Sequence, residues 1–185
     1  MSSTIKNKNK DQVREAVTAR HTISVVSKLN LNALSRIVGL FSGRGFDIDS
    51  ISFGRSQQPD KARITITTHG DEQIISQIIK QLDKIIEVIS VEDLTYEPFV
   101  ERELAIIKVD APAGKRSEVM EVVEVFRGKI VDITPERLSI EITGKEDKID
   151  AAIGMLKEFE IRQVARSGTI ALKREFRSEI HDREQ

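Results

Sequence analysis

The side chains that most often carry out chemistry in proteins are either missing from this chain or scattered along it. The sequence has no cysteine and three histidines, His21, His69 and His181. The lack of cysteine excludes disulfides, thiolate catalysis and metal sites built on cysteine. The histidines do not fall into the short spacings of metal-binding motifs, so we expect all three at the surface. No metal site is predicted.

Glycines and carboxylates do not form a recognisable active site either. Gly43-Arg44-Gly45 lacks the third glycine of a dinucleotide motif and follows a predicted helix rather than a strand. Asp47 and Asp49 are too few ligands for a metal, and no carboxylate pair stands out for acid–base catalysis. We therefore expect no catalytic residues and no activity in this chain alone.

Composition excludes several other classes of protein. The 185 residues carry 29 Lys and Arg against 30 Asp and Glu, and only 4% are aromatic. A nucleic-acid binder usually has a basic excess or aromatic residues for stacking, so no nucleic-acid partner is expected. No apolar run reaches the roughly 18–20 residues that cross a bilayer, and residues 1–20 lack the apolar stretch of a secretory signal. We expect a cytoplasmic protein with no membrane contact.

Apolar periodicity predicts the same order of elements twice. Alternating residues predict strands, and apolar residues three and four apart predict amphipathic helices. Asp71 is the predicted N-cap of one helix, Asn32 is a candidate N-cap of another, and Gly43 and Gly45 end that helix. The predicted order is strand 22–25, helix 34–41, strands 51–53 and 62–67, helix 74–82 and strand 86–91, then strand 104–109, helix 119–126, strands 130–133 and 138–142, helix 149–156 and one or two strands within 161–172.

This order is βαββαβ, the split βαβ arrangement of ferredoxin-like domains. We predict an α+β protein with two tandem ferredoxin-like domains. The predicted divisions are a polar tail at 1–20, a first domain at 21–96, a linker at 97–102, a second domain at 103–174 and a polar tail at 175–185.

A shared motif indicates that the two halves are copies of one unit. Residues 41–48, FSGRGFDI, and residues 126–133, FRGKIVDI, each have Phe, one residue, Gly, a cation, two residues and then Asp-Ile. The same shift aligns Leu34, Ile37 and Val38 with three valines. A helix exit alone would explain the Phe and the Gly, but it would not explain the common Asp-Ile, so we interpret the pattern as an internal repeat.

Several short segments, in order and spacing, resemble the small regulatory subunits of acetohydroxyacid synthase, also called acetolactate synthase. Each segment is weakly diagnostic by itself, but together they extend from about His21 to Arg174. The matching segments are 33–42 with 44–46, 47–51, 70–72 with Gln77, 80–82 and Lys84, 91–94, 100–104 with 107–109, 126–132 and 164–168.

The resemblance implies an amino-terminal ACT domain, a related carboxy-terminal domain and a homodimer in which ACT sheets pair side by side. It also implies a partner, the catalytic subunit, which uses thiamine diphosphate, magnesium and FAD in valine, leucine and isoleucine biosynthesis. The small chain would activate that partner and would usually confer allosteric inhibition by a branched-chain amino acid. No cofactor is expected in this chain itself.

The predicted effector site departs from the family pattern. In the family the amino acid binds at the ACT dimer interface, against a loop that normally reads Asn-Glu-Pro-Gly and is 29-LNLN-32 here. Leu29 removes an amide, Asn32 fills space that glycine leaves open, and Asp47 replaces an Asn and cannot donate to a carboxylate. We therefore expect weak or absent valine binding. The candidate effector residues are Leu29, Asn32, Ala33 and Leu34, the last three through backbone amides at a helix N-terminus, with Asp47 and Ile48.

A second hypothesis also fits the residues. The chain could be a free-standing ACT sensor of a small ligand, with no synthase partner. Copurification separates the two, because the sensor would bring down no large thiamine-dependent chain.

Overall fold

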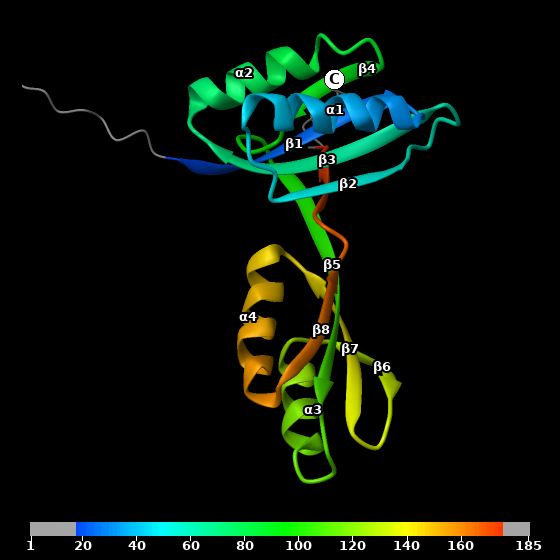
Figure 1. Cartoon of the computed structure of the whole chain (residues 1–185), viewed down its shortest axis with the longest axis vertical. Helices are drawn as coiled ribbons and strands as arrows, with labels where there is room; N and C mark the ends of the chain where they lie inside the picture. Colours follow the sequence, from blue (N-terminus) through cyan, green and yellow to red (C-terminus); the bar gives the residue numbers. More distant parts are fainter. Residues whose placement is uncertain (1–17, 176–185) are drawn as a thin grey trace, which may run out of the picture.

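The structure, a computed structural model, describes residues 18–175. Most of the two predicted tails, 1–17 and 176–185, lies outside the described residues. The described chain forms two α+β units, one above the other in Figure 1, joined by a long strand and by the returning chain that runs beside it. The predicted ferredoxin-like order is confirmed in both units.

The amino-terminal unit is a four-stranded antiparallel sheet with two helices on one face (Figure 1). Ile23, Val25, Ile64 and Ile66 point from the central strands toward the helices and are fully buried. The elements are β1 Ala19–Lys28, α1 Leu31–Arg44, β2 Ser50–Arg55, β3 Lys61–Gly70, α2 Glu72–Leu82 and β4 Val88–Asp93, with strand order β2-β3-β1-β4.

The carboxy-terminal unit repeats this plan. Its sheet order, β6-β7-β5-β8, corresponds strand for strand to that of the first unit. Register shifts occur at Val26/Ser27 between β1 and β4 and at Lys108/Val109 between β5 and β8, as expected for two copies of one unit. The elements are β5 Phe99–Asp110, α3 Arg116–Val125, β6 Lys129–Ile133, β7 Arg137–Gly144, α4 Glu146–Leu156, the 3₁₀ turn η1 Lys157–Phe159, β8 Ile161–Arg166 and β9 Ile170–Lys173.

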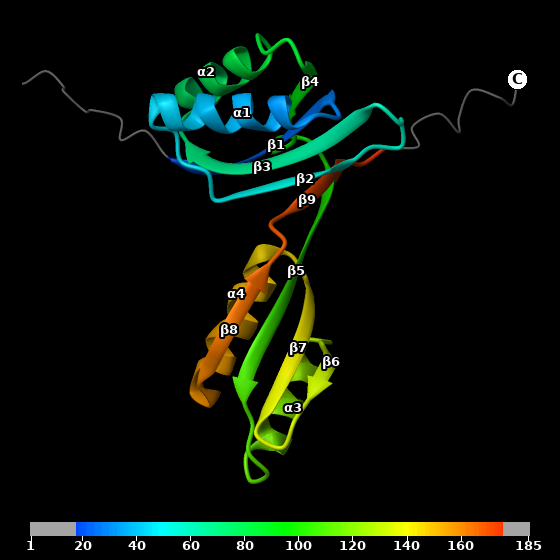
Figure 2. The ribbon, with the colours of Figure 1, turned by 45° about the vertical axis from the view of Figure 1, so that its right-hand side comes forward.

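The connection between the units is strand rather than loop. β5 begins at Phe99, so four residues of the predicted 97–102 linker are already paired. Their partner is β9, with Phe99 opposite Lys173 and Arg102 opposite Ile170. We call this antiparallel pair, residues 99–102 and 170–173, the ribbon. It lies against the face of the amino-terminal sheet that the helices leave open, and Figure 2 shows β9 beneath β2 and β3.

The helix ends confirm one predicted cap and correct another. Asp71 caps α2, since its Oδ1 accepts from the backbone N–H of Ile74 at 2.8 Å. Asn30, rather than Asn32, caps α1. Gly45 ends α1 in the left-handed conformation, with φ of 67°, whereas Gly43 is still helical. In the second unit Arg127 has the positive φ and Gly128 is packed against Glu141, so the glycines of the repeat serve different purposes.

The expectation that every histidine lies at the surface is wrong for His21. Its side chain is buried in β1, and its Nδ1 lies 2.9 Å from Oδ2 of Asp93 on β4. A neighbouring carboxylate satisfies the buried imidazole, which the sequence spacing could not indicate. His69 is exposed beside Asp49, and His181 lies beyond the described residues. In residues 18–175 no helix is both long and apolar enough to cross a membrane.

Candidate functional site: effector loop and domain junction

The first half of the predicted effector site lies at the start of α1. Oδ1 of Asn30 accepts the backbone N–H of Ala33 at 2.8 Å. A helix N-terminus binds a carboxylate through unpaired backbone amides. The cap therefore occupies one of the three predicted donors, the amides of Asn32, Ala33 and Leu34. Asn32 is exposed, Ala33 is buried and Leu34 is half-buried. Fewer amides remain for a ligand here than the sequence suggested.

Leu29, just before this helix, is held by the neighbouring turn. Its N–H donates to the carbonyl of Asp60 at 2.8 Å. Its side chain lines a shallow hollow that also includes Ile89 of β4. Leu29 therefore presents an apolar side chain, with no amide to bond a ligand.

The second half of the predicted site lies at the opposite end of α1. Asp47 and Ile48 follow the helix, whose 14 residues separate them from its first turn by about 20 Å at 1.5 Å per residue. The Asp47 backbone carbonyl accepts from the Thr68 hydroxyl, while its carboxylate is exposed. Ile48 packs on the core of the unit. One chain therefore does not bring the two halves of the site together.

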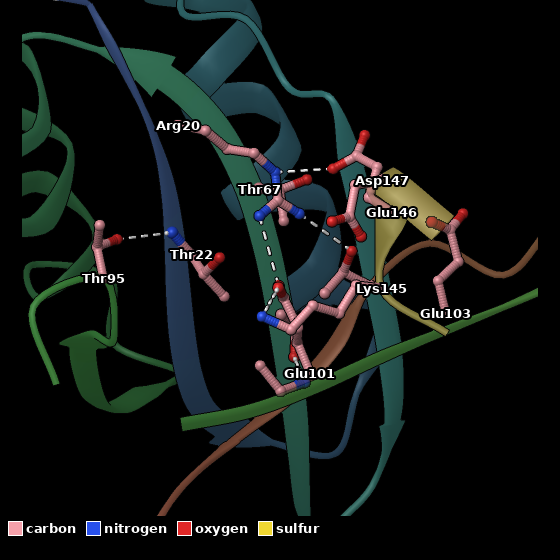
Figure 3. A network of polar contacts seen from close by, with 12 residues as sticks. Arg20, Thr22, Thr67, Thr95, Glu101, Glu103, Lys145, Glu146 and Asp147 are labelled. Atoms are coloured by element: carbon pink, nitrogen blue, oxygen red, sulfur yellow. Dashed lines mark hydrogen bonds and ion pairs between the residues drawn. The ribbon is translucent and has the colours of Figure 1, made fainter. Parts of the chain in front are cut away.

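A second polar cluster, which the sequence analysis missed, lies where the two units meet. Arg20, near the start of β1, reaches three other segments (Figure 3). Its Nη1 is 3.4 Å from Glu101 Oε2 on β5, its Nη2 donates to Thr169 Oγ1 at 3.3 Å, and its Nε lies 2.8 Å from Glu146 Oε2 on α4. Lys145 adds a contact to Glu101 at 3.6 Å. We call Arg20, Glu101, Glu146 and Thr169 the junction.

Hydroxyl groups on the open face of the amino-terminal sheet hold the returning chain. Ser52 Oγ donates to the carbonyl of Ser167 at 3.0 Å, and Thr65 Oγ1 accepts from the N–H of Ala171 at 3.3 Å. Gly168, between these contacts, has φ of 72°, and a Cβ there would lie 3.2 Å from Ser50. Only glycine fits this bend without strain.

A buried ion pair extends the polar contacts into the second unit. Glu103 is 4% exposed and accepts two hydrogen bonds from Arg166, Nε to Oε1 at 2.6 Å and Nη2 to Oε2 at 2.8 Å. Arg166 also donates to Asp150 at 2.7 Å. The hydrogen bond to Glu103 raises the pKa of the Arg166 guanidinium above its usual value. This pair fixes β8 beside β5 just below the ribbon.

The junction could not be recognised from sequence patterns. Arg20 fell within the predicted tail, whereas β1 begins at Ala19, so the tail boundary at residue 20 is corrected to an earlier position. Glu101 fell in the predicted linker, and its partners are distant along the chain. Within residues 18–175 no three His, Cys, Asp or Glu side chains gather into a metal site. The junction consists of ion pairs and a hydrogen bond that link the two units.

Both halves of the chain match known families. Residues 23–90 match the family described as "AHAS small subunit-like ACT domain", and residues 102–175 match "Small subunit of acetolactate synthase". The acetolactate synthase small subunit of Aquifex aeolicus is 42% identical over 167 residues, which cover 90% of this chain and 87% of that protein. The chain belongs to the acetolactate synthase small subunit family.

Other members of the acetolactate synthase small subunit family agree with this assignment. The probable small subunit of Archaeoglobus fulgidus is 43% identical over 84% of this chain and 97% of its own. The crystal structure of the small subunit from Thermotoga maritima superposes with a TM-score of 0.78 at 37% identity, covering 85% of this chain and 99% of that one. The chain is thus a regulatory subunit of acetolactate synthase, and catalysis belongs to the large subunit.

Proposed function

We propose that this chain activates the catalytic subunit of acetolactate synthase in the cytoplasm. Thiamine diphosphate, magnesium and FAD would all be held by that partner. Family membership along most of the chain, 42% identity covering 87% of the Aquifex small subunit, is the observation that carries the proposal. Activation works by docking, which shifts the catalytic subunit toward its more active conformations.

The contact between the two units supports a conformational mechanism. Four residues of the ribbon belong to the same strand, β5, that forms the centre of the second sheet. Arg20 connects the first sheet to both the ribbon and α4. A change in the amino-terminal unit therefore has a direct path to the carboxy-terminal unit.

We also propose that two copies pair their amino-terminal sheets edge to edge. Among the described strands, β2 and β4 are the edges of that sheet. Charged residues discourage edge pairing, and β4 ends with Glu92 and Asp93 whereas β2 carries only Arg55. β2 is therefore the edge that a second copy would occupy.

Such a dimer would complete the divided effector site. In an antiparallel β2 pair centred on residue 53, residue 51 of one chain lies opposite residue 55 of the other. The end of β2 lies at the same end of the unit as the start of α1, because helix and strand run in opposite directions (Figure 1). Asp47 and Ile48 of one chain would then face residues 29–34 of the second copy.

Weak or absent valine binding remains our prediction for this site. Leu29, Asn32 and the occupied Ala33 amide each remove or hinder a contact, and each lost polar contact costs roughly 1–3 kcal/mol. Titration calorimetry should show no micromolar binding of valine, leucine or isoleucine. The double variant Leu29→Asn with Asn32→Gly restores the family residues, and we expect it to bind at least one of them tenfold or more tightly, about 1.4 kcal/mol. Micromolar affinity in the unaltered chain would contradict the prediction.

The deciding experiment mixes this chain with its cognate large subunit. Acetolactate formation is measured with and without the small chain, and then with each branched-chain amino acid. We expect activity to rise on addition of the small chain, and the two chains to comigrate in gel filtration. A free-standing sensor would leave the rate unchanged and would migrate alone.

A further inference from the structure

A groove separate from both parts of the predicted effector site runs between β2 and the outer face of the ribbon. Its volume is about 490 Å³, within the range of about 300–1,000 Å³ typical of small-molecule sites. Its walls come from segments far apart in the sequence. The lining residues are Ile51, Ser52, Phe53, Gly54, Arg55, Arg63, Thr65, Val100, Arg102, Ser167, Ile170, Ala171 and Leu172. We call it the ribbon groove.

Positive charge is concentrated in this groove. Arg55, Arg63 and Arg102 come from three different strands, and none of the lining residues is an aspartate or glutamate. None of the three forms an ion pair with another residue of 18–175. This contrasts with the junction, where cations and carboxylates alternate.

Two of these guanidinium groups are oriented and still have donors to offer. Arg63 Nη1 donates to Ser24 Oγ at 3.0 Å, and Arg102 Nη1 donates to the carbonyl of Glu101 at 2.7 Å. Each guanidinium has five N–H donors in a planar fork that matches carboxylate and phosphate oxygens. One bond to a neutral acceptor fixes the side chain without neutralising its charge.

The other wall of the groove is apolar. The ribbon alternates, so Ala171 faces the amino-terminal sheet and is buried, while Val100, Ile170 and Leu172 face outward. Ile170 is 59% exposed and Leu172 56%. Covering these side chains with the apolar body of a ligand is favourable at about 25 cal/mol per Å² of buried apolar surface.

We propose that the ribbon groove binds a small amphipathic oxyanion, a molecule with a carboxylate or phosphate head and an apolar body. The head pairs with Arg63 and Arg102, and the body lies on Val100, Ile170 and Leu172. A zwitterionic amino acid fits poorly, because the lining residues include no carboxylate for its ammonium group. The groove therefore selects a different ligand class from the one expected at the start of α1.

The test measures binding to the isolated full-length chain by titration calorimetry. Octanoate and octyl phosphate are the probes, and octylammonium is the matched control with the same body and the opposite charge. We expect at least one anionic probe to bind with a Kd below about 1 mM and octylammonium to show no binding. The two anionic probes distinguish a carboxylate site from a phosphate site. Binding of neither, or equal binding of octylammonium, overturns the proposal.

Variants locate the site. Arg102→Gln, on an exposed strand, and Arg63→Gln should each weaken the anionic probe by about tenfold, and Leu172→Ser should weaken it as well. Arg44→Gln, at the exposed end of α1, is the matched control and should leave affinity unchanged. Arginine variants that bind as well as the unaltered chain would refute the assignment. Because no catalytic subunit is present, failure here is separate from failure of the activation proposal.

Discussion

Asp110 illustrates how one carboxylate at the end of β5 joins neighbouring strands. Arg162 on β8 contacts it with three hydrogen bonds, the shortest from Nη2 to Oδ2 at 2.6 Å, and Arg137 on β7 adds one at 3.1 Å. The hydrogen bonds from Arg162, and then the one from Arg137, hold the pKa of Asp110 below its ordinary value of 3.8. The carboxylate is therefore most favourable to the fold in its ionised form.

This lowered pKa predicts how stability depends on pH. A depressed folded-state pKa stabilises the protein above the unfolded-state value and loses that effect as the pH falls through the folded value. Asp110→Asn should therefore lower the free energy of unfolding by a constant amount above about pH 5, and the difference should shrink below 3.8. Urea unfolding at several pH values measures this. Asp132→Asn, at an exposed position on β6, is the control and should be close to neutral. A difference that grows as the pH falls would have the wrong sign.

Single residues also show where sequence reasoning succeeded. Asp71 was identifiable as a cap because a helical apolar pattern begins three residues later, and the bond to Ile74 confirms it. Asn30 and Asn32 could each have capped α1, and local pattern does not distinguish them. Arg20 and Glu103 were not identifiable, since their partners lie 63 to 149 residues away and only the folded chain brings them together.

Among the elements, the ribbon depends on the sharp bend at Gly168. Gly168→Ala places a Cβ at φ of 72°, in contact with Ser50, and should destabilise the protein by about 1–3 kcal/mol. Gly154→Ala is the matched control. Gly154 lies in α4 with open space around it, so alanine there should stabilise by roughly 0.5–1 kcal/mol. Urea unfolding of both variants checks this, and a Gly168→Ala variant as stable as the unaltered chain would show that the bend does not require glycine.

The two edge strands allow a direct test of the proposed dimer. Phe53 on β2 is 36% exposed and Ile89 on β4 is 47% exposed, so lysine is tolerated similarly at either site in a monomer. Phe53→Lys should shift the chain from dimer to monomer in sedimentation, because two lysines would meet at the centre of the paired edges. Ile89→Lys should leave the dimer intact. A dimer lost with Ile89→Lys and retained with Phe53→Lys would place the interface at β4.

The strand pattern was predictable because it depends on local periodicity, whereas the connection between the units was not. Alternation in β3 and β7 shows directly in residues 62–67 and 138–142, and both are confirmed as central strands. Segment 97–102 is polar and contains Pro98, which is typical of a linker. The segment forms a strand because β9, some 70 residues later, pairs with it. The hydroxyl of Thr65 in the first sheet in turn accepts the N–H of Ala171 on β9.

At the scale of the whole molecule, the two units are connected by contacts of very different strength. The two strands of the ribbon pair with each other, and β9 packs on β1 and β3 with the Ala171 N–H donating to the buried Thr65 hydroxyl, so the ribbon ties the first sheet to β5. The junction consists of partly exposed ion pairs, in which the side chain of Arg20 is 26% exposed and that of Glu146 is 35% exposed. Ion pairs of this kind add little to stability, so they can rearrange at small cost in free energy. The junction therefore has the properties expected of an adjustable contact between α4 and the first sheet.

Under the proposed function, loosening the junction should uncouple activation from binding. Arg20→Met keeps the length of the side chain but removes its contacts to Glu101, Thr169 and Glu146. We expect comigration with the catalytic subunit to persist, while the increase in acetolactate formation falls by about fivefold or more, the lower end of typical coupling between sites.

Arg36→Gln, on the exposed side of α1 with one long contact to Glu87, is the control and should activate normally. Full activation by Arg20→Met would show that the junction does not carry the activating signal, and loss of comigration would place Arg20 in the docking surface itself.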